Sequence, residues 1–369
     1  MRDRIFVLFI YLIIILMLVG CWDAREIKDY DLIPLSGIDK VNNHVRLLDE
    51  VTISSNSSSD TQSSTSNKSK IFVSEGRSFT EARNSYFRRA EKDQFLGSIR
   101  AIIFSENISK GGLEEYLNLN RGLRNINRSA YLFTTNTELD KLLANNQTSG
   151  TSIGINLEQL SNKTLKKGRL NNTSLNIVME NALVKHTGYV LNNIDLVNGK
   201  IEVDGYSVFK ENKKIGFLPA SKINGVNYLI VKKPYSEHTV DFDGVRVAFS
   251  AQVKNKEIKP FYNRKNINFK IRLVVDCEII DFSKMTKLNS EKIKVLQNVI
   301  SKVIRREVIS TITISQKKYE CDYLQFYKAF RERYNFEFKK MNWNENYKQA
   351  KFNVEVKVDV KPANAINLE

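Results

Sequence analysis

Cysteine is scarce in this sequence of 369 residues, with three in total. Beyond Cys21 there are Cys277 and Cys321, too few for the disulfide framework of a small secreted domain. One bridge between these two would be compatible with an exported protein. Cys277 lies in a predicted strand and Cys321 in a predicted helix, so two buried free thiols are the stronger expectation.

Histidine is equally scarce, and catalytic signatures are missing. The three histidines are His44, His186 and His238. None of them has a second His or Cys nearby at the spacing of zinc ligands. No nucleophile elbow, phosphate loop or dinucleotide fingerprint occurs. Asp322 lies in a predicted helical segment rich in aromatic residues. A hydrogen bond at a helix end explains the presence of an acidic residue there as well as a catalytic role does. The sequence therefore predicts no enzyme activity, no metal site and no cofactor.

Long hydrophobic runs are also lacking, with one exception at the amino terminus. Residues 5–19 are apolar without a charge, Gly or Pro, and Arg2 and Arg4 precede them. At ~1.5 Å per residue this run is about 22 Å long as a helix, shorter than the ~30 Å hydrocarbon core of a bilayer. Length and flanking charge are typical of a secretory signal peptide.

The residues after this run carry a second signal. Leu18-Val19-Gly20-Cys21 resembles the lipobox of bacterial lipoproteins, in which the cysteine is acylated and becomes the new amino terminus. The alternative is an uncleaved signal anchor followed by a chance cysteine. We predict a signal peptide over 1–20, lipidation at Cys21, and a chain that lies outside the cytoplasm and is held on the lipid bilayer by its acyl chains.

Positive charge is concentrated in the second half of the chain. The formal net charge is +16, and residues 196–369 hold 33 basic against 20 acidic residues. If this domain is tethered to a membrane, its positive charge could face anionic headgroups. The alternative is that the charge belongs to a lysine-rich surface exposed to solvent and has no specific role. No motif indicates nucleic-acid binding, so no nucleic-acid partner is predicted.

The first half, 21–195, is predicted to be an α+β region. Short strands are expected around a turn at Asn42-Asn43, and residues 54–70 form a Ser-rich loop with no apolar residue. Ser78, followed by Glu81, has the spacing of a capping box at the start of a helix. Strands and helices then alternate, as in sheets covered by helices. A subdivision near 135–175 stays open.

The second half, 196–369, is predicted to be another α+β domain. A turn at 211–213 separates two strands, and residues 267–277 alternate apolar and polar side chains at period two. An amphipathic helix is expected within 290–312, a second within 319–334, and a last strand over 352–360. The fold class is therefore α+β, with mixed or antiparallel sheets packed with helices, in a multi-domain exported lipoprotein.

Several of these stretches resemble the Ger(x)C family, the lipoprotein C subunits of spore nutrient-germinant receptors. The similar segments are Gly20–Asp29, "SEGRSFTEARNSYFRRA", "FLGSIRAIIFSENISKGGLEEYL", "YSVFKENKKIGFL", "YECDYLQFYKAFRERY" and "FNVEVKVDV". Asp322 fits the family pattern. Ser98 stands where the family commonly has His, so no role of that His is carried over.

The resemblance implies a non-enzymatic membrane lipoprotein on the outer face of the spore's inner membrane. It implies integral-membrane A and B receptor subunits as partners and nutrient-triggered germination as the process. It leaves open which nutrient acts and whether this subunit touches it. The alternative is an exported solute-binding lipoprotein that captures a nutrient in its own cleft, although no internal repeat of two similar lobes is detectable.

Overall fold

The structure is a computed structural model that describes residues 26–53, 68–144, 151–263, 266–283 and 289–361, together with Arg4. The predicted signal peptide, the predicted lipidation site Cys21 and most of the Ser-rich segment 54–70 lie outside the described residues. Within the ranges given, no helix has the length and apolar character needed to cross a membrane.

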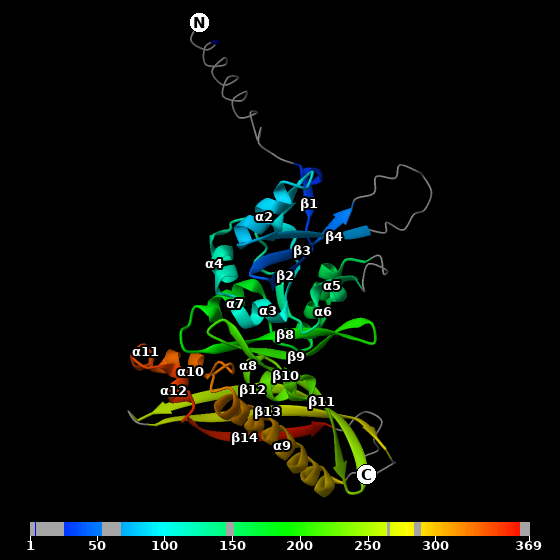
Figure 1. The fold of residues 1–369 in the computed structure, drawn as a ribbon. Helices are drawn as coiled ribbons and strands as arrows, with labels where there is room; N and C mark the ends of the chain where they lie inside the picture. Colours follow the sequence, from blue (N-terminus) through cyan, green and yellow to red (C-terminus); the bar gives the residue numbers. More distant parts are fainter. Residues whose placement is uncertain are drawn as a thin grey trace.

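The larger of two main sheets has eight strands in the order β10-β9-β8-β7-β6-β2-β3-β4 (Figure 1). Its four central strands are parallel, and antiparallel hairpins extend both edges. The strands are β2 (Leu35–Val41), β3 (His44–Ile53), β4 (Lys68–Gly76), β6 (Ala101–Phe104), β7 (Tyr131–Thr134), β8 (Gly188–Val197), β9 (Lys200–Lys210) and β10 (Lys213–Pro219). The central β6 is buried along its whole length, as expected of a parallel strand covered on both faces.

The predicted turns between these strands are confirmed. Asn42 and Asn43 both have positive φ, 47° and 63°, as do Glu211 and Asn212, 48° and 65°. Two consecutive residues of this conformation close a tight hairpin whose twist matches that of its strands. Strands β3 and β4 also pair in antiparallel register, so the Ser-rich segment connects the two strands of one hairpin.

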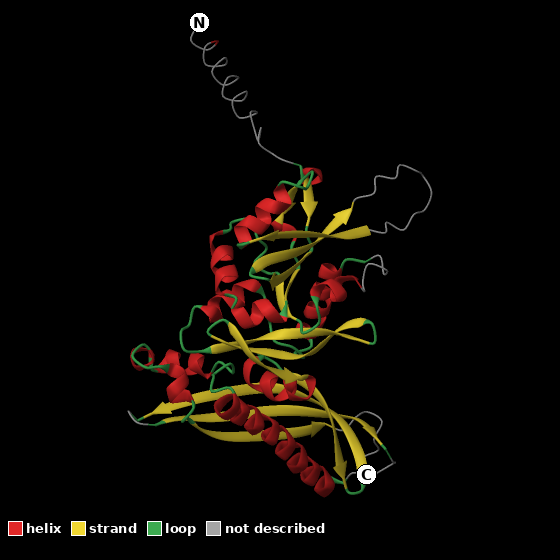
Figure 2. Cartoon of the chain, in the orientation of Figure 1, coloured by secondary structure: helices red, strands yellow, loops and turns green. Residues whose placement is uncertain are grey.

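Six helices cover the two faces of this sheet within the described residues (Figure 2). They are α2 (Phe79–Phe87), α3 (Glu106–Gly111), α4 (Glu114–Gly122), α5 (Leu139–Ala144), α6 (Ile153–Lys166) and α7 (Leu175–Ala182). Apolar residues of α2, α3, α4 and α7 form one core with the sheet, and those of α5 and α6 form another on the opposite face. Ser78 is confirmed as the N-cap of α2, because its Oγ accepts a hydrogen bond from Glu81 N (3.2 Å). The Glu81 carboxylate reaches back as in a capping box, but it accepts from Arg77 N (2.8 Å), one residue before the N-cap.

The second sheet has four strands, β11 (Tyr235–Phe242), β12 (Val245–Tyr262), β13 (Ile267–Phe282) and β14 (Lys351–Lys361). The first three are antiparallel, whereas β14 lies parallel to β13. The long helix α9 (Ser290–Thr313) crosses one face of this sheet (Figure 2) and continues into a π-helical turn, η4 (Ile314–Lys318). The remaining helices are α8 (Ile223–Ile230), α10 (Phe326–Arg333), α11 (Asn335–Phe338) and α12 (Trp343–Tyr347).

The structure differs from the prediction for the second half in two details. Helix α10 begins at Phe326, not near residue 319, because the Asp322 carboxylate accepts the N–H groups of Phe326 and Tyr327 and thereby starts the helix there. Cys321 therefore lies before the helix instead of inside it. Cys277 lies in β13 as expected, and both thiols are buried and free. Mixed sheets packed with helices confirm the α+β class.

Strands β8 and β9 are shared by two cores. Tyr189 and Phe209 face the helices of the first half, whereas Val190 and Val208 face the core built by β11–β14 and α8–α10. Alternation of side chains across a strand makes this double contact possible. The predicted division at 195/196 falls inside β8, and the eight-stranded sheet continues to Pro219. The division into domains itself stays a prediction.

Candidate functional site

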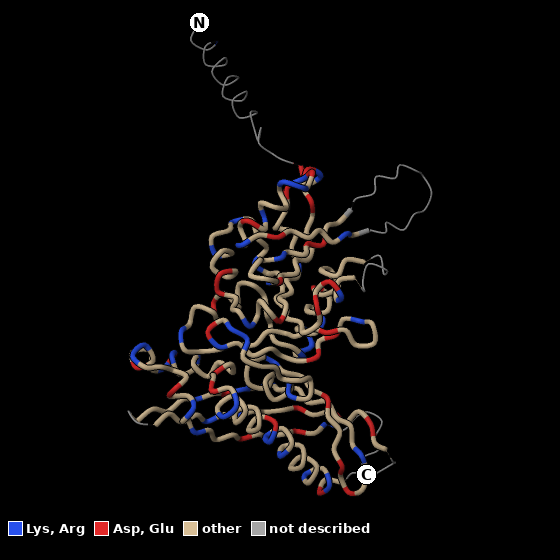
Figure 3. Tube along the Cα trace, viewed as in Figure 1, with Lys and Arg blue, Asp and Glu red and all other residues tan. Residues whose placement is uncertain are grey.

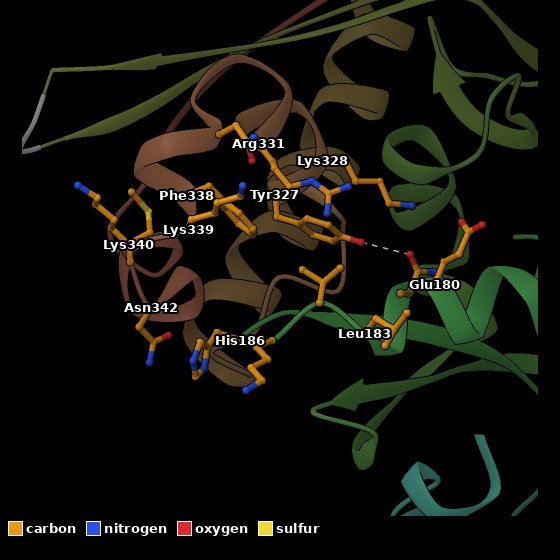
Figure 4. Close-up of a pocket in the computed structure, with 15 residues that line it drawn as sticks. Glu180, Leu183, His186, Tyr327, Lys328, Arg331, Phe338, Lys339, Lys340 and Asn342 are labelled. Atoms are coloured by element: carbon orange, nitrogen blue, oxygen red, sulfur yellow. Dashed lines mark hydrogen bonds between the residues drawn. The ribbon is translucent and has the colours of Figure 1, made fainter. Parts of the chain in front are cut away.

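A cleft of about 940 Å³ opens where the two halves of the chain meet (Figure 4). One wall is the end of α7 and the residues that follow it, within 180–186. The other wall consists of residues within 327–342, from α10, α11 and the turn that leads into α12. The hydroxyl of Tyr327 donates to Asn181 Oδ1 (3.2 Å) at the base of the cleft and joins the two walls.

Asp322 holds the second wall in place. Its side chain is fully buried, and it accepts hydrogen bonds from Phe326 N (3.1 Å), Tyr327 N (2.7 Å) and Trp343 Nε1 (2.7 Å). Burial raises the pKa of Asp322 to about 6, and these hydrogen bonds limit the rise. Of the two explanations open from the sequence, the helix-end hydrogen bond is the one seen. Asp322 does not line the cleft; it positions the residues that do.

The lining of the cleft is strongly basic. Five cationic side chains contribute to it, against the single carboxylate of Glu180: Lys185, Lys328, Arg331, Lys339 and Lys340. None of the five makes an ion pair with a carboxylate of the described residues. Desolvation lowers the pKa of Lys328, and Glu180 opposes that shift. Figure 3 shows both signs of charge along the segment from α10 to α12, and outside the cleft lining this segment has Arg333 against Glu332, Glu337 and Glu345, so the positive excess of this segment is confined to the cleft.

Two of these cations lie over the ring of Tyr327. Lys328 Nζ is 5.9 Å and Arg331 Cζ 5.7 Å from its centroid. Phe338 stacks beside the same ring, with centroids 6.1 Å apart. Cations over an aromatic face gain some stabilisation without neutralising their charge. The cleft therefore combines an aromatic floor with positive charge that is available to a ligand.

A second polar cluster lies inside the second half, away from the cleft. His238 Nε2 is 2.9 Å from both Tyr228 Oη and Ser236 Oγ, and its Nδ1 is 3.6 Å from Glu307 Oε1. Glu307 Oε2 is buried and has no hydrogen-bond partner among the described residues. Desolvation lowers the pKa of His238 and raises that of Glu307 to about 7. Both shifts favour the uncharged forms of these two side chains.

Replacing Glu307 with glutamine is expected to remove a loss of stability at alkaline pH. Because the carboxyl has a pKa near 7 when folded and 4.5 in its ordinary state, its contribution to stability is complete below 4.5 and is lost as pH rises through 7. The neutral amide avoids this loss, so the variant gains about 2 kcal/mol in unfolding free energy relative to the parent between pH 5 and pH 8. Urea unfolding of the parent and the variant at both pH values measures the gain. An unfolding free energy that changes equally with pH in the two proteins would contradict the prediction.

The other residues discussed in the sequence analysis make hydrogen bonds or close polar contacts with the protein itself. Ser98 Oγ accepts from Ile33 N (2.7 Å) and donates to Phe95 O (2.6 Å). His44 Nδ1 is 3.0 Å from Asn42 O in a turn, and His186 Nδ1 is 3.3 Å from Glu211 Oε1. No group of three or more His, Cys, Asp or Glu side chains in the described ranges is arranged to hold a metal ion.

Both halves of the chain match models of spore germination proteins. Residues 23–196 match the "Spore germination protein N-terminal domain", and residues 204–362 match "Spore germination B3/ GerAC like, C-terminal". The chain is 24% identical to Spore germination protein GerQC of Bacillus cereus, over 95% of this chain and 97% of that protein. It is 22% identical to Spore germination protein KC of Bacillus subtilis (strain 168), over 91% and 90% of the two.

A solved structure supports the same assignment at the level of the fold. The crystal structure of the GerBC protein superposes with a TM-score of 0.54 at 16% identity, covering 88% of this chain and 96% of that one. These matches define the class, an α+β spore germination protein in two matched parts. The chain belongs to the Ger(x)C family and has a role in spore germination.

Proposed function

We propose that this protein is a membrane-anchored lipoprotein subunit of a spore germinant receptor. It is held by acyl chains on Cys21 at the outer face of the spore's inner membrane and acts together with integral-membrane A and B subunits. The observation that carries the proposal is that the family match, from residue 23 to 362, begins directly behind the Leu-Val-Gly-Cys sequence. The role is non-enzymatic, in keeping with the absence of a catalytic signature from the sequence.

Anchoring at Cys21 sets which end of the protein meets the membrane. Glu26, the first residue of the continuous described chain, is five positions after Cys21, a span of at most about 18 Å. Helix η1 (Ile27–Asp29) and β1 (Tyr30–Leu32) therefore lie close to the bilayer. Figure 1 places β11–β14 at the opposite end of the molecule. Under this proposal the basic second half points away from the lipid, contrary to the expectation that its charge faces headgroups.

Replacing Cys21 with alanine tests the proposal in spores of the natural host. Because two acyl chains are needed for stable anchoring, we expect the variant to leave the membrane fraction and the nutrient response to be lost. Germination by non-nutrient triggers should be unchanged and serves as the control. A variant that stays in the membrane fraction would contradict lipid anchoring, and a normal nutrient response in spores without a redundant receptor would contradict the function.

The basic cleft favours one second candidate, a solute-binding lipoprotein that captures an anionic nutrient itself. Its volume of about 940 Å³ lies within the range of small-molecule sites. Calorimetric titration of the purified protein with amino acids and sugars separates the two candidates. Tight binding by this chain alone would favour nutrient capture, and no heat would favour the subunit role.

A further inference from the structure

Among the described residues, the five cations of the cleft make no ion pair, and Glu180 is the single carboxylate that lines the cleft with them. Of the five cations, Lys328 and Arg331 stand one turn apart on α10, and Lys185 reaches the cleft from the opposite wall. Some exposed basic side chains elsewhere in the described chain have carboxylate partners, such as Lys254 with Asp276 (2.6 Å) and Lys270 with Glu355 (2.9 Å). Like charges gathered without counterions repel one another, and this cost is relieved when an anionic group binds between them.

The shape of the cleft favours an extended ligand over a small one. It is an open trough, and Leu183 on its rim is 62% exposed although it is apolar. The floor offers the half-buried ring of Phe338, which stacks on the buried ring of Tyr327. A free amino acid or sugar could contact only part of such a trough, whereas a peptide can place carboxylates on several cations and an apolar side chain on the floor together. Apolar contacts at the centre and charges at the rim are typical of protein interfaces.

We propose that this cleft binds an acidic peptide segment, bearing an apolar side chain between its carboxylates, of a partner protein in the receptor. This inference rests on the proposed function, because it assigns one surface through which the subunit assembles. The orientation set by Cys21 supports a protein partner over lipid. The elements that form its walls, α7, α10 and α11, lie part of the way down the molecule, away from β1 (Figure 1).

The first test uses the purified mature chain and a labelled peptide, Ac-Glu-Leu-Glu-Glu-Phe-Glu-amide, as the probe. The variant K328E/R331E reverses two cleft charges, and the matched control K302E/R306E reverses two exposed charges one turn apart on α9. We expect the cleft variant to weaken binding at least about tenfold and the control to change it less than about twofold, because close charge pairs carry large coupling across an interface. Equal urea midpoints of the variants establish that the fold is intact.

Three results of this test would overturn the proposal. The first is absence of peptide binding, or equal loss in both variants. The second is displacement of the peptide by free glutamate at a comparable concentration, which would assign the cleft to a small carboxylic acid. The third is loss, in the cleft variant alone, of binding to vesicles of phosphatidylglycerol, with no effect on the peptide, which would assign the surface to lipid.

A second test in spores separates this inference from the proposed function. We expect K328E/R331E to stay in the membrane fraction through its acylated Cys21 but to lose co-purification with integral-membrane receptor subunits, while K302E/R306E keeps both. Co-purification of the cleft variant at the parental level would overturn the cleft as the partner site and leave the function intact. Failure of the parental protein to co-purify at all would count against the function itself.

Discussion

Alanine at Asp322 is expected to lower the free energy of unfolding by about 3–5 kcal/mol. The parent carboxylate is fully buried and satisfies three donors, Phe326 N, Tyr327 N and Trp343 Nε1. Alanine leaves all three buried without an acceptor, and each unsatisfied donor costs about 1–3 kcal/mol, with less than additive sums. It also leaves a cavity where the carboxylate was. Urea unfolding at neutral pH measures the loss.

The asparagine variant and a surface control sharpen this measurement. Asparagine at 322 keeps one oxygen but points an amide N–H group at the remaining donors, so we expect an intermediate loss. Alanine at Asp359, an exposed residue of β14, should change stability by less than about 0.5 kcal/mol. Because Asp322 starts α10, its loss should also weaken peptide binding at the cleft. A loss at Asp322 no larger than at Asp359 would contradict the structural role.

Local patterns in the sequence were sufficient for several elements. The helix start at Ser78 and Glu81 needs partners within four residues, and the alternation of β13 follows from burial of one face. For α9 the sequence indicated an amphipathic helix. Its buried face runs through Leu296, Ile300 and Ile304, since the contacts made by α9 on the sheet decide which residues are covered.

Long-range pairing could not be predicted in the same way. Strand β14 was expected from the alternation of apolar and polar residues. Nothing within 352–360 predicts that it pairs in parallel with β13, which lies about 80 positions earlier in the chain. The same holds for β8 and β9, whose two faces belong to two different cores. Helix α3, between β6 and Gly112, was missed because six residues give too little periodicity, although Ser105 accepts from Ile108 N (3.4 Å) as its N-cap.

The cleft was visible in the sequence only in part. The excess of basic residues after 196 was noted, but nothing in the sequence assigned it to a cleft. The opposite wall, with Glu180 and Lys185, comes from the first half, and its position depends on how α7 packs beside α10. Asp322 was noticed because an acid is unusual among aromatic residues, but its role required knowing that Trp343 returns to it from 21 positions later.

Alanine at Glu50 is expected to lower the free energy of unfolding by about 3–4 kcal/mol, close to the effect at Asp322. Glu50 lies on β3 and is fully buried. Its carboxylate accepts from Ile153 N, Gly154 N and Ser152 Oγ, each at 3.0 Å, and so caps the first turn of α6 from a strand about 100 positions away. An ordinary N-cap contributes only about 1 kcal/mol, because water can replace it.

Here water has little access, which is why we expect the larger loss. Gly154 is packed so closely on the preceding strand connection that an added Cβ would lie 2.2 Å from Pro34 O. The three donors freed by Glu50→Ala therefore stay buried, and the negative charge that complements the helix N-terminus is also lost. Hydrogen exchange of the α6 amides should rise more than that of the β13 amides. The variant Glu202→Ala, at an exposed position of β9, serves as the control. Uniform acceleration across both cores would instead indicate that α6 unfolds only together with the whole protein.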